Sequence, residues 1–150
     1  MPVIRNTIRI KAPIEVCFDL ARNVEIHPKT TKKTKEKAVG GVTTGLLEEG
    51  DTVEWEAVHF GIKQRLTSKI TEMNSPNEFK DIMVKGAFKS FIHTHTFVAS
   101  GNETEMTDHF DYLSPLGFFG KAADFLFLER YMQKFLSDRA VELKKIAETN

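Results

Sequence analysis

A chain of 150 residues is long enough to bury one sizeable core, and we expect residues 1–150 to form a single domain. Its 21 basic and 21 acidic residues give a formal net charge of zero, which excludes an overall electrostatic case for binding nucleic acid or an anionic membrane. One cysteine, Cys17, excludes an internal disulfide. Arg5 and Arg9 interrupt the first apolar segment, so we expect no signal peptide and a cytoplasmic location.

The first strand is predicted over residues 3–10, where isoleucines alternate with basic residues. Pro13 ends this strand and suits the first turn of a short helix, on whose apolar face Cys17 reads as a core residue. A second short helix is expected between Asn23 and Pro28. Residues 29–37 then carry five lysines, which are typical either of a phosphate-binding patch or of a solvated loop. We favour the loop, because no aromatic residue is interleaved to stack on bases.

The middle of the chain is predicted to be an antiparallel sheet. Glycines punctuate a weak hairpin over residues 38–44 and 46–49, and a clearer alternation of apolar and polar residues follows. A two-residue turn at Phe60-Gly61 would place Trp55 opposite Leu66. Two further strands run from about residue 78 to 84 and from 90 to 97. A turn at Gly101-Asn102 leads into the last strand, at residues 104–112, and places His95 opposite Asp108.

A long helix is predicted from about Lys121 to Glu148. Its second half carries one apolar stripe, and its first half leaves almost no polar face, so it must be covered on more than one side. A core helix packed on the sheet fits this pattern better than a membrane helix, because the apolar half is too short to span a bilayer. The stripe consists of Leu136, Ala140, Leu143 and Ala147.

The order of these elements and four local segments resemble the START-like SRPBCC superfamily, which includes plant allergens related to birch pollen Bet v 1 and a bacterial polyketide cyclase-like branch. The segments are IKAPIEVCF (residues 10–18), FKSFIHTHTF (88–97), TEMTD (104–108) and YLSPLG (112–117). The resemblance covers nearly the whole chain. It implies an α+β helix-grip fold, in which a seven-stranded antiparallel sheet curves around the long C-terminal helix and two short helices follow the first strand. It also implies a cavity for an apolar ligand between sheet and helix.

The inward faces of the strands would present a largely apolar cleft with a few convergent polar groups, which is typical of a small-molecule site. The predicted ligand-binding residues are Trp55, His59, Gln64, Leu66, Phe79, Asp81, Met83, Phe91, His93, His95, Phe97, Met106, Asp108, Phe110 and Tyr112 from the sheet, and Phe125 and Leu126 from the helix.

The polar members of this set have several interpretations. They can form a buried structural network, or they can orient the polar end of a lipophilic ligand. A third interpretation is catalysis, with His95 as general base held by Asp108, as cyclisation or dehydration of a polyketide-like substrate requires. His93 and His95 could also hold a metal with Asp108, but aromatic neighbours crowd them, and we predict neither a metal nor another cofactor.

We therefore expect binding of a hydrophobic small molecule, which is lipid-like, polyketide-like or aromatic, by a carrier, sensor or sequestering protein. A polyketide cyclase or dehydratase is the alternative, so the sequence leaves enzymatic activity open. A protein-interaction module that uses the outer surface of the fold is a second alternative. We expect no nucleic-acid partner and no stable membrane insertion, and a homodimer stays open.

Overall fold

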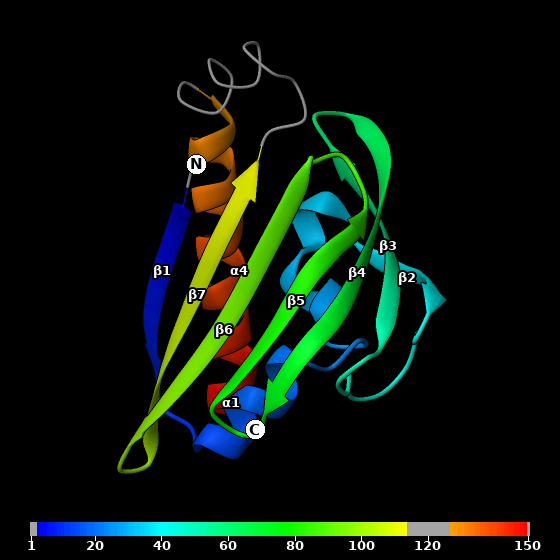
Figure 1. Cartoon of the computed structure of the whole chain (residues 1–150). Coiled ribbons are helices and arrows are strands. Elements are labelled where there is room, and N and C mark those ends of the chain that lie inside the picture. Colours follow the sequence, from blue (N-terminus) through cyan, green and yellow to red (C-terminus); the bar gives the residue numbers. More distant parts are fainter. Residues whose placement is uncertain (1–2, 114–126, 150) are drawn as a thin grey trace.

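The computed structural model describes residues 3–113 and 127–149, which form the helix-grip fold (Figure 1). A first strand is followed by short helices, six more strands and a long C-terminal helix. The elements are β1 (Val3–Ile10), α1 (Ile14–Ala21), α2 (His27–Thr30), the 3-10 helix η1 (Lys32–Thr34), β2 (Lys37–Gly41), β3 (Thr52–His59), β4 (Ile62–Asn74), β5 (Glu78–Lys85), β6 (Ser90–Ser100), β7 (Glu103–Leu113) and α4 (Glu129–Thr149).

The seven strands form one sheet in the order β1-β7-β6-β5-β4-β3-β2, and every neighbouring pair is antiparallel. The sheet twists and curves around α4, which lies against its inner side (Figure 1). Helices α1 and α2 also pack on α4. Both predicted features of the fold, the seven-stranded antiparallel sheet and the helix that it encloses, are confirmed.

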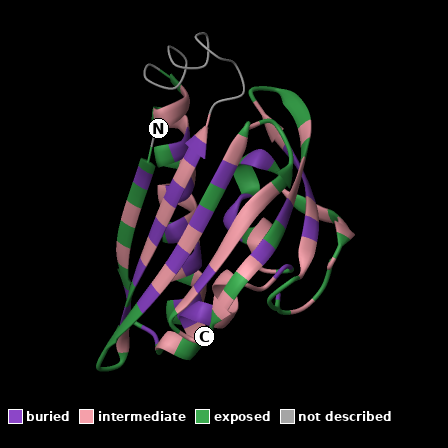
Figure 2. Cartoon of the chain, in the orientation of Figure 1, coloured by how far each residue is buried: buried purple, intermediate pink, exposed green. Residues whose placement is uncertain are grey.

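The hairpin registers predicted from the turns are also confirmed. Trp55 pairs with Leu66 across a turn in which Phe60 and Gly61 have φ angles of 54° and 74°. Two consecutive left-handed residues are what a type I′ hairpin turn requires. Because side chains alternate between the two faces of a strand, this register puts the inward residues of β3 beside those of β4. The buried residues alternate along the strands in the same way (Figure 2).

The weak hairpin predicted at residues 38–44 and 46–49 is wrong. Strand β2 pairs with β3 instead, with a bulge between Ala38 and Gly40. Leu46 makes only an isolated bridge, to Asn23. The glycines at positions 41, 45 and 50 all have positive φ angles, so the chain turns too often between β2 and β3 to form another strand.

The lysine-rich segment is only partly the solvated loop that the sequence predicts. Its five lysines are exposed, but the threonines between them are buried, because α2 packs this segment against α4. Thr30, Thr31 and Thr34 are 4–6% exposed. Lysines that point outward and threonines that point inward give the segment two distinct faces.

The apolar stripe of α4 is confirmed, since all four of its predicted residues are buried, together with Met132. The predicted start of this helix, including Phe125 and Leu126, lies outside the described residues. Within residues 3–113 and 127–149, no helix combines the length and the apolar character that crossing a membrane requires.

Buried apolar residues form two clusters at the two ends of the sheet. One gathers around α1, where the Phe18 ring makes edge contacts with Phe79 and Phe97 at centroid distances of 5.5 and 5.3 Å. The other lies between the sheet and the first turns of α4, and includes Phe91 and Phe110. Helix α1 thus fills one end of the sheet, and at the other end α4 faces the strands, with His27 of α2 beside it.

We predict that Thr104→Val destabilises the fold by about 1–3 kcal/mol, because it leaves a buried carbonyl without its donor. Thr104 is fully buried, and its hydroxyl donates to the Ala12 carbonyl at 2.8 Å, which ties β7 to the β1–α1 connection. The matched control is Thr107→Val, whose hydroxyl meets Thr7 at an exposed position and should matter by less than about 0.5 kcal/mol. Urea denaturation measures both, and equal losses would contradict the assignment.

Candidate functional site

A cavity of about 260 Å³ lies between the sheet and α4, close to the lower end of the volumes typical of small-molecule sites. Most of its wall is aromatic or aliphatic, and a few titratable side chains interrupt it. The wall consists of His27, Glu36, Trp55, Ala57, His59, Phe60, Gln64, Arg65, Leu66, Ser68, Asp81, Ala87, Phe88, Phe91, His93, Phe110, Leu128, Tyr131, Met132, Phe135, Leu136 and Arg139.

The structure brings eight of the sequence-predicted residues into this wall: Trp55, His59, Gln64, Leu66, Asp81, Phe91, His93 and Phe110. Seven others lie outside it. Phe79, Phe97 and Met106 face inward, but at the end of the sheet that α1 fills, so they belong to packed core. His95 and Asp108 are buried behind the wall, and Met83 and Tyr112 pack in the second apolar cluster. Phe125 and Leu126 fall outside the described residues.

Sequence reasoning assigned the long helix to the site only through Phe125 and Leu126, and it missed the wall residues within α4 and those of the lysine-rich segment. Arg139 continues the series Leu128, Met132, Phe135 at intervals of four, three and four, so its place on the inward face of the helix was readable from the sequence. Glu36 is the only acidic residue in the lysine-rich stretch, and local sequence carries no sign that it points inward.

Glu36 forms a buried pair with His27. His27 Nε2 donates to Glu36 Oε1 at 2.7 Å, and the two side chains are 13% and 9% exposed. The His27 ring also lies 4.3 Å from the Trp55 ring. Burial and the nearby Arg139 lower the pKa of His27. Burial opposes ionisation of Glu36, but His27 and Arg139 outweigh it and lower its pKa, so this wall carries a carboxylate.

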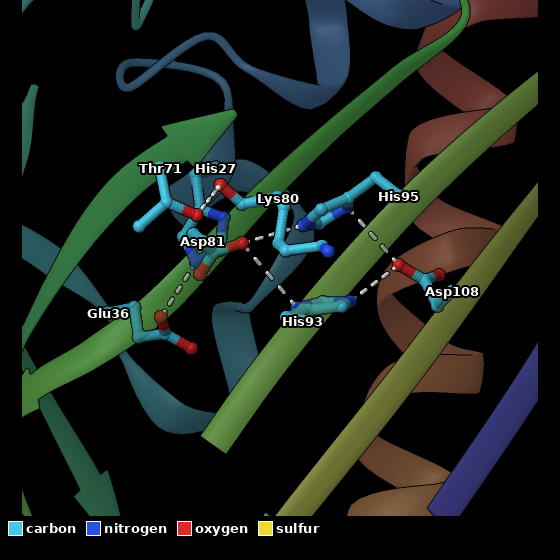
Figure 3. A network of polar contacts seen from close by, with 8 residues as sticks. All are labelled: His27, Glu36, Thr71, Lys80, Asp81, His93, His95 and Asp108. Carbon is cyan, nitrogen blue, oxygen red and sulfur yellow. Dashed lines mark hydrogen bonds and ion pairs between the residues drawn. The ribbon is translucent and has the colours of Figure 1, made fainter. Parts of the chain in front are cut away.

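A second polar group joins three strands: Asp81 on β5, His93 and His95 on β6, and Asp108 on β7 (Figure 3). We call these four residues the His–Asp quartet. His95 stands directly opposite Asp108, and His93 opposite Asp81, so the predicted register is confirmed. The shortest contacts are nevertheless diagonal: His93 Nε2 to Asp108 Oδ1 and His95 Nε2 to Asp81 Oδ1, both at 2.9 Å.

Each imidazole of the quartet faces a carboxylate on both sides. His95 Nδ1 lies 3.4 Å from Asp108 Oδ1, and His93 Nδ1 lies 4.0 Å from Asp81 Oδ1. The two rings are 3.8 Å apart, and the Phe79 ring stacks on His95 at 4.1 Å. Asp81 and His93 reach the cavity wall, whereas His95 and Asp108 support them from behind.

Burial disfavours the charged form of all four side chains of the quartet, and hydrogen bonds reverse this effect on the pKa of three of them. Burial and the neighbouring His95 lower the pKa of His93. Burial also disfavours the charged form of His95, but its bonds to Asp108 and Asp81 prevail and raise its pKa. Burial disfavours ionisation of Asp81 and Asp108 too. Hydrogen bonds with the histidines outweigh this and hold the pKa of both carboxyls below their usual range.

These contacts bear on the catalytic interpretation. A general base needs a ring nitrogen with a free lone pair within reach of the substrate. Both nitrogens of His95 face carboxylates within 3.4 Å, and the residue is 3% exposed. The geometry therefore favours a supporting role for His95 over the role of a base.

A third polar pair lies near the open edge of the cavity. His59 Nδ1 and the Tyr131 hydroxyl are 2.5 Å apart. Burial lowers the pKa of His59 and raises that of Tyr131, so the neutral forms of both are favoured. Phe60 packs on Tyr131 and on Phe127, and both phenylalanines are more than half exposed. An apolar rim that is open to solvent thus borders this pair.

Comparison with known proteins gives a family and a set of similar folds. The family described as "Polyketide cyclase / dehydrase and lipid transport" matches residues 10–138. Similar crystal structures include a protein from Thermus thermophilus, at 22% identity, with a TM-score of 0.79 and coverage of 96% of this chain and 95% of that one. No curated protein matches significantly.

Two further solved structures are similar in fold. A START superfamily protein from Mycobacterium smegmatis is 13% identical, with a TM-score of 0.77 over 98% of this chain and 97% of that one. Ginseng major latex-like protein 151 from Panax ginseng is 16% identical, with a TM-score of 0.69 over 97% of each chain. At these identities the similarity concerns the fold alone.

We predict that Asp108→Ala destabilises the protein by roughly 3 kcal/mol, because two buried imidazoles lose their shared acceptor. The control on the same strand is Glu105→Ala. Glu105 points outward, is 48% exposed and pairs only loosely with Arg9, at 4.0 Å. Its removal should cost less than about 0.5 kcal/mol. Chemical denaturation followed by tryptophan fluorescence measures both, and a loss for Asp108→Ala as small as for the control would contradict a structural role.

We also predict a pH dependence of stability that involves His27. The pKa of His27 is lowered in the folded state, so below about pH 6.5 the unfolded chain binds a proton at this residue more readily than the folded protein does. The contribution of neutral His27 to the unfolding free energy is therefore complete above about pH 6.5 and declines as the pH falls further. The unfolding free energy of His27→Gln should therefore fall less steeply between pH 6.5 and 5 than that of the wild type. The difference in slope is at most about 1.4 kcal/mol per pH unit. Equal slopes in urea titrations across this range would contradict the prediction.

Proposed function

The chain belongs to the polyketide cyclase/dehydrase and lipid transport family, and on that premise we propose that it binds a hydrophobic small molecule as a carrier, sensor or sequestering protein. The observation that carries the proposal is the apolar cavity of about 260 Å³ between the sheet and α4. A concave and largely apolar space that opens at one edge is typical of a small-molecule site. An occupant would remove its aromatic wall from water, which supports the proposal.

The wall of the cavity supports an amphipathic ligand. Phe91, Phe110 and Leu136 offer aromatic and aliphatic surface to its apolar body. Asp81 and His93 on the sheet face, with Arg139 on α4, offer donors and acceptors to a polar end. Apolar surface supplies most of the binding free energy in such sites, and a few polar groups fix the orientation.

We predict that filling the cavity abolishes binding. Ala57 is buried in the wall on β3, and Ala57→Phe would project a ring into the space. The matched control is Val58→Phe, one residue along the same strand, where side chains point to the other face. The probes are the fluorophore 1-anilinonaphthalene-8-sulfonate and, as its competitor, a medium-chain fatty acid.

Wild type and Val58→Phe should bind the probe at micromolar concentration, and Ala57→Phe should bind it at least roughly tenfold more weakly, a difference of about 1.4 kcal/mol. Thermal melts establish that each variant is folded. A wild type that takes up neither probe, or undiminished binding by a folded Ala57→Phe, would overturn the proposal.

A second candidate, a cyclase-like enzyme, is favoured by the His59–Tyr131 pair, because a neutral imidazole beside a phenol at a cavity wall can exchange a proton with a bound ketone. Its first step would be removal of a proton from the carbon next to a carbonyl. Deuterium exchange into an aryl alkyl ketone, followed by NMR, tests this step. The step would be established if the wild type exchanges deuterium faster than buffer does, if His59→Gln loses this acceleration, and if His109→Gln keeps it. His109 lies on the outer face of β7 and serves as the control. Exchange no faster than in buffer would exclude it.

A further inference from the structure

The His–Asp quartet has one contact that hydrogen bonding does not explain. His93 Nε2 lies 2.9 Å from Asp108 Oδ1, and since an ionised carboxylate only accepts, the hydrogen of the neutral imidazole sits on Nε2. The other nitrogen, Nδ1, then carries a lone pair. It lies 4.0 Å from Asp81 Oδ1, which is too far for a hydrogen bond, so in the neutral form of His93 two electron-rich atoms are neighbours in a buried site.

A cation between these two atoms would turn this contact into an attraction. Zinc binds imidazole nitrogen and carboxylate oxygen at about 2.0–2.2 Å, so two ligand atoms of a tetrahedral ion lie about 3.4 Å apart. The observed gap is 4.0 Å, and an approach of the two side chains by about 0.6 Å would let one ion bind both atoms. His95 Nε2 lies 2.9 Å from the same Asp81 oxygen. The three ligand atoms, from Asp81, His93 and His95, lie within 4.8 Å of one another.

We propose that Asp81, His93 and His95 form a binding site for a divalent transition-metal ion of the zinc and cobalt type, with Asp108 as the carboxylate that orients both imidazoles. This assignment goes beyond ligand binding, and it changes the sequence-based interpretation in two ways. That interpretation predicted no metal, and the triad it weighed used Asp108 in place of Asp81.

The position of Asp108 supports the site independently. The nitrogens of the two rings that do not face Asp81, His93 Nε2 and His95 Nδ1, both lie near Asp108 Oδ1, at 2.9 and 3.4 Å. Metal-bound histidines almost always donate their second N–H to a carboxylate, a carbonyl or water, and this contact fixes the ring orientation. Asp81, on one side of the two imidazoles, would be a metal ligand, and Asp108, on the other side, would orient both rings (Figure 3).

The charge balance around the quartet also calls for a cation. Among the described residues around this end of the cavity, Glu36, Asp81 and Asp108 are acidic, and Arg139 is a fixed positive charge. The other arginine of the wall, Arg65, is paired with Glu54 and Glu56. Metal binding requires both histidines in their neutral form, and two negative charges would then remain in excess, which a divalent ion would neutralise. Isolated charges are costly away from water.

An ion held here would face the cavity on one side. Asp81 and His93 belong to the cavity wall, whereas His95 and Asp108 lie behind it. Three protein ligands leave a fourth coordination position for water or for an oxygen of a bound molecule, as in catalytic zinc sites.

The test uses cobalt and zinc alone, on the chelator-treated protein of 150 residues without any organic ligand. One equivalent of Co²⁺ should give the intense visible absorption of a tetrahedral nitrogen and oxygen site, and Zn²⁺ should abolish it. Affinity for Zn²⁺, measured in competition with a chromophoric chelator, should fall at least roughly tenfold in His93→Gln and in Asp81→Asn, and roughly 10–100-fold in Asp108→Asn. The control His109→Gln removes a histidine on the outer face of β7 and should bind as the wild type does.

Wild-type protein alone also decides the question if the variants fold poorly. In nitrogen-detected NMR of the imidazoles, Zn²⁺ should shift the signals of two of the five histidines, His93 and His95. The absence of stoichiometric binding, or shifts confined to His27, His59 or His109, would overturn the proposal. Binding of the fluorescent probe by metal-free protein is scored separately, so failure of the metal site leaves the test of ligand binding intact.

Discussion

Strands β6 and β7 are paired along their whole length, and the register of this hairpin determines how the His–Asp quartet is assembled. The turn at Gly101 sets Ser100 opposite Glu103, and from there the pairs His95–Asp108 and His93–Phe110 follow by counting. A slip by one residue would turn all these side chains to the outer face of the sheet. Strand β5 then adds Asp81 opposite His93, which completes the quartet. The tight β6–β7 turn, the longer β5–β6 connection and the alternation of side chains along the strands thus bring these four residues within hydrogen-bonding distance.

The two ends of the sheet differ because only one of them is filled by helix α1. Helix α1 places the Phe18 ring against both Phe79 and Phe97, and the three rings fill the space in front of the strands. Large aromatic side chains in edge contact give this end a dense core. At the other end α4 faces the strands without such a wedge among the described elements, and the cavity opens there. One end of the curved sheet therefore forms a dense core, and the other end leaves room for a ligand.

What the sequence could predict follows from the range of the interactions involved. Alternation along strands and residue types in turns are local signals, and they were enough for the Trp55–Leu66 and His95–Asp108 registers. The inward position of Glu36 depends on how α2 packs against α4, a contact between segments about 100 residues apart, which no local pattern encodes. The excess of glycine before β3 was read as a hairpin, because turn residues are common to hairpins and to irregular loops. The division of the inner face into packed core and cavity wall depends in the same way on where α1 docks.

Stability alone is a weak explanation for the buried polar groups of this fold. Buried ion pairs often contribute less than apolar residues of the same volume would, because the charges lose their hydration. The quartet keeps two carboxylates and two imidazoles in the interior, with side chains only 4–15% exposed, between aromatic neighbours that could have closed the gap. Once His93 and Asp81 open onto a cavity, however, the same groups acquire a use, because in a medium of low polarity each of them interacts strongly with whatever enters. Burial of these groups costs desolvation free energy, and a molecule or ion bound in the cavity would offset part of that cost.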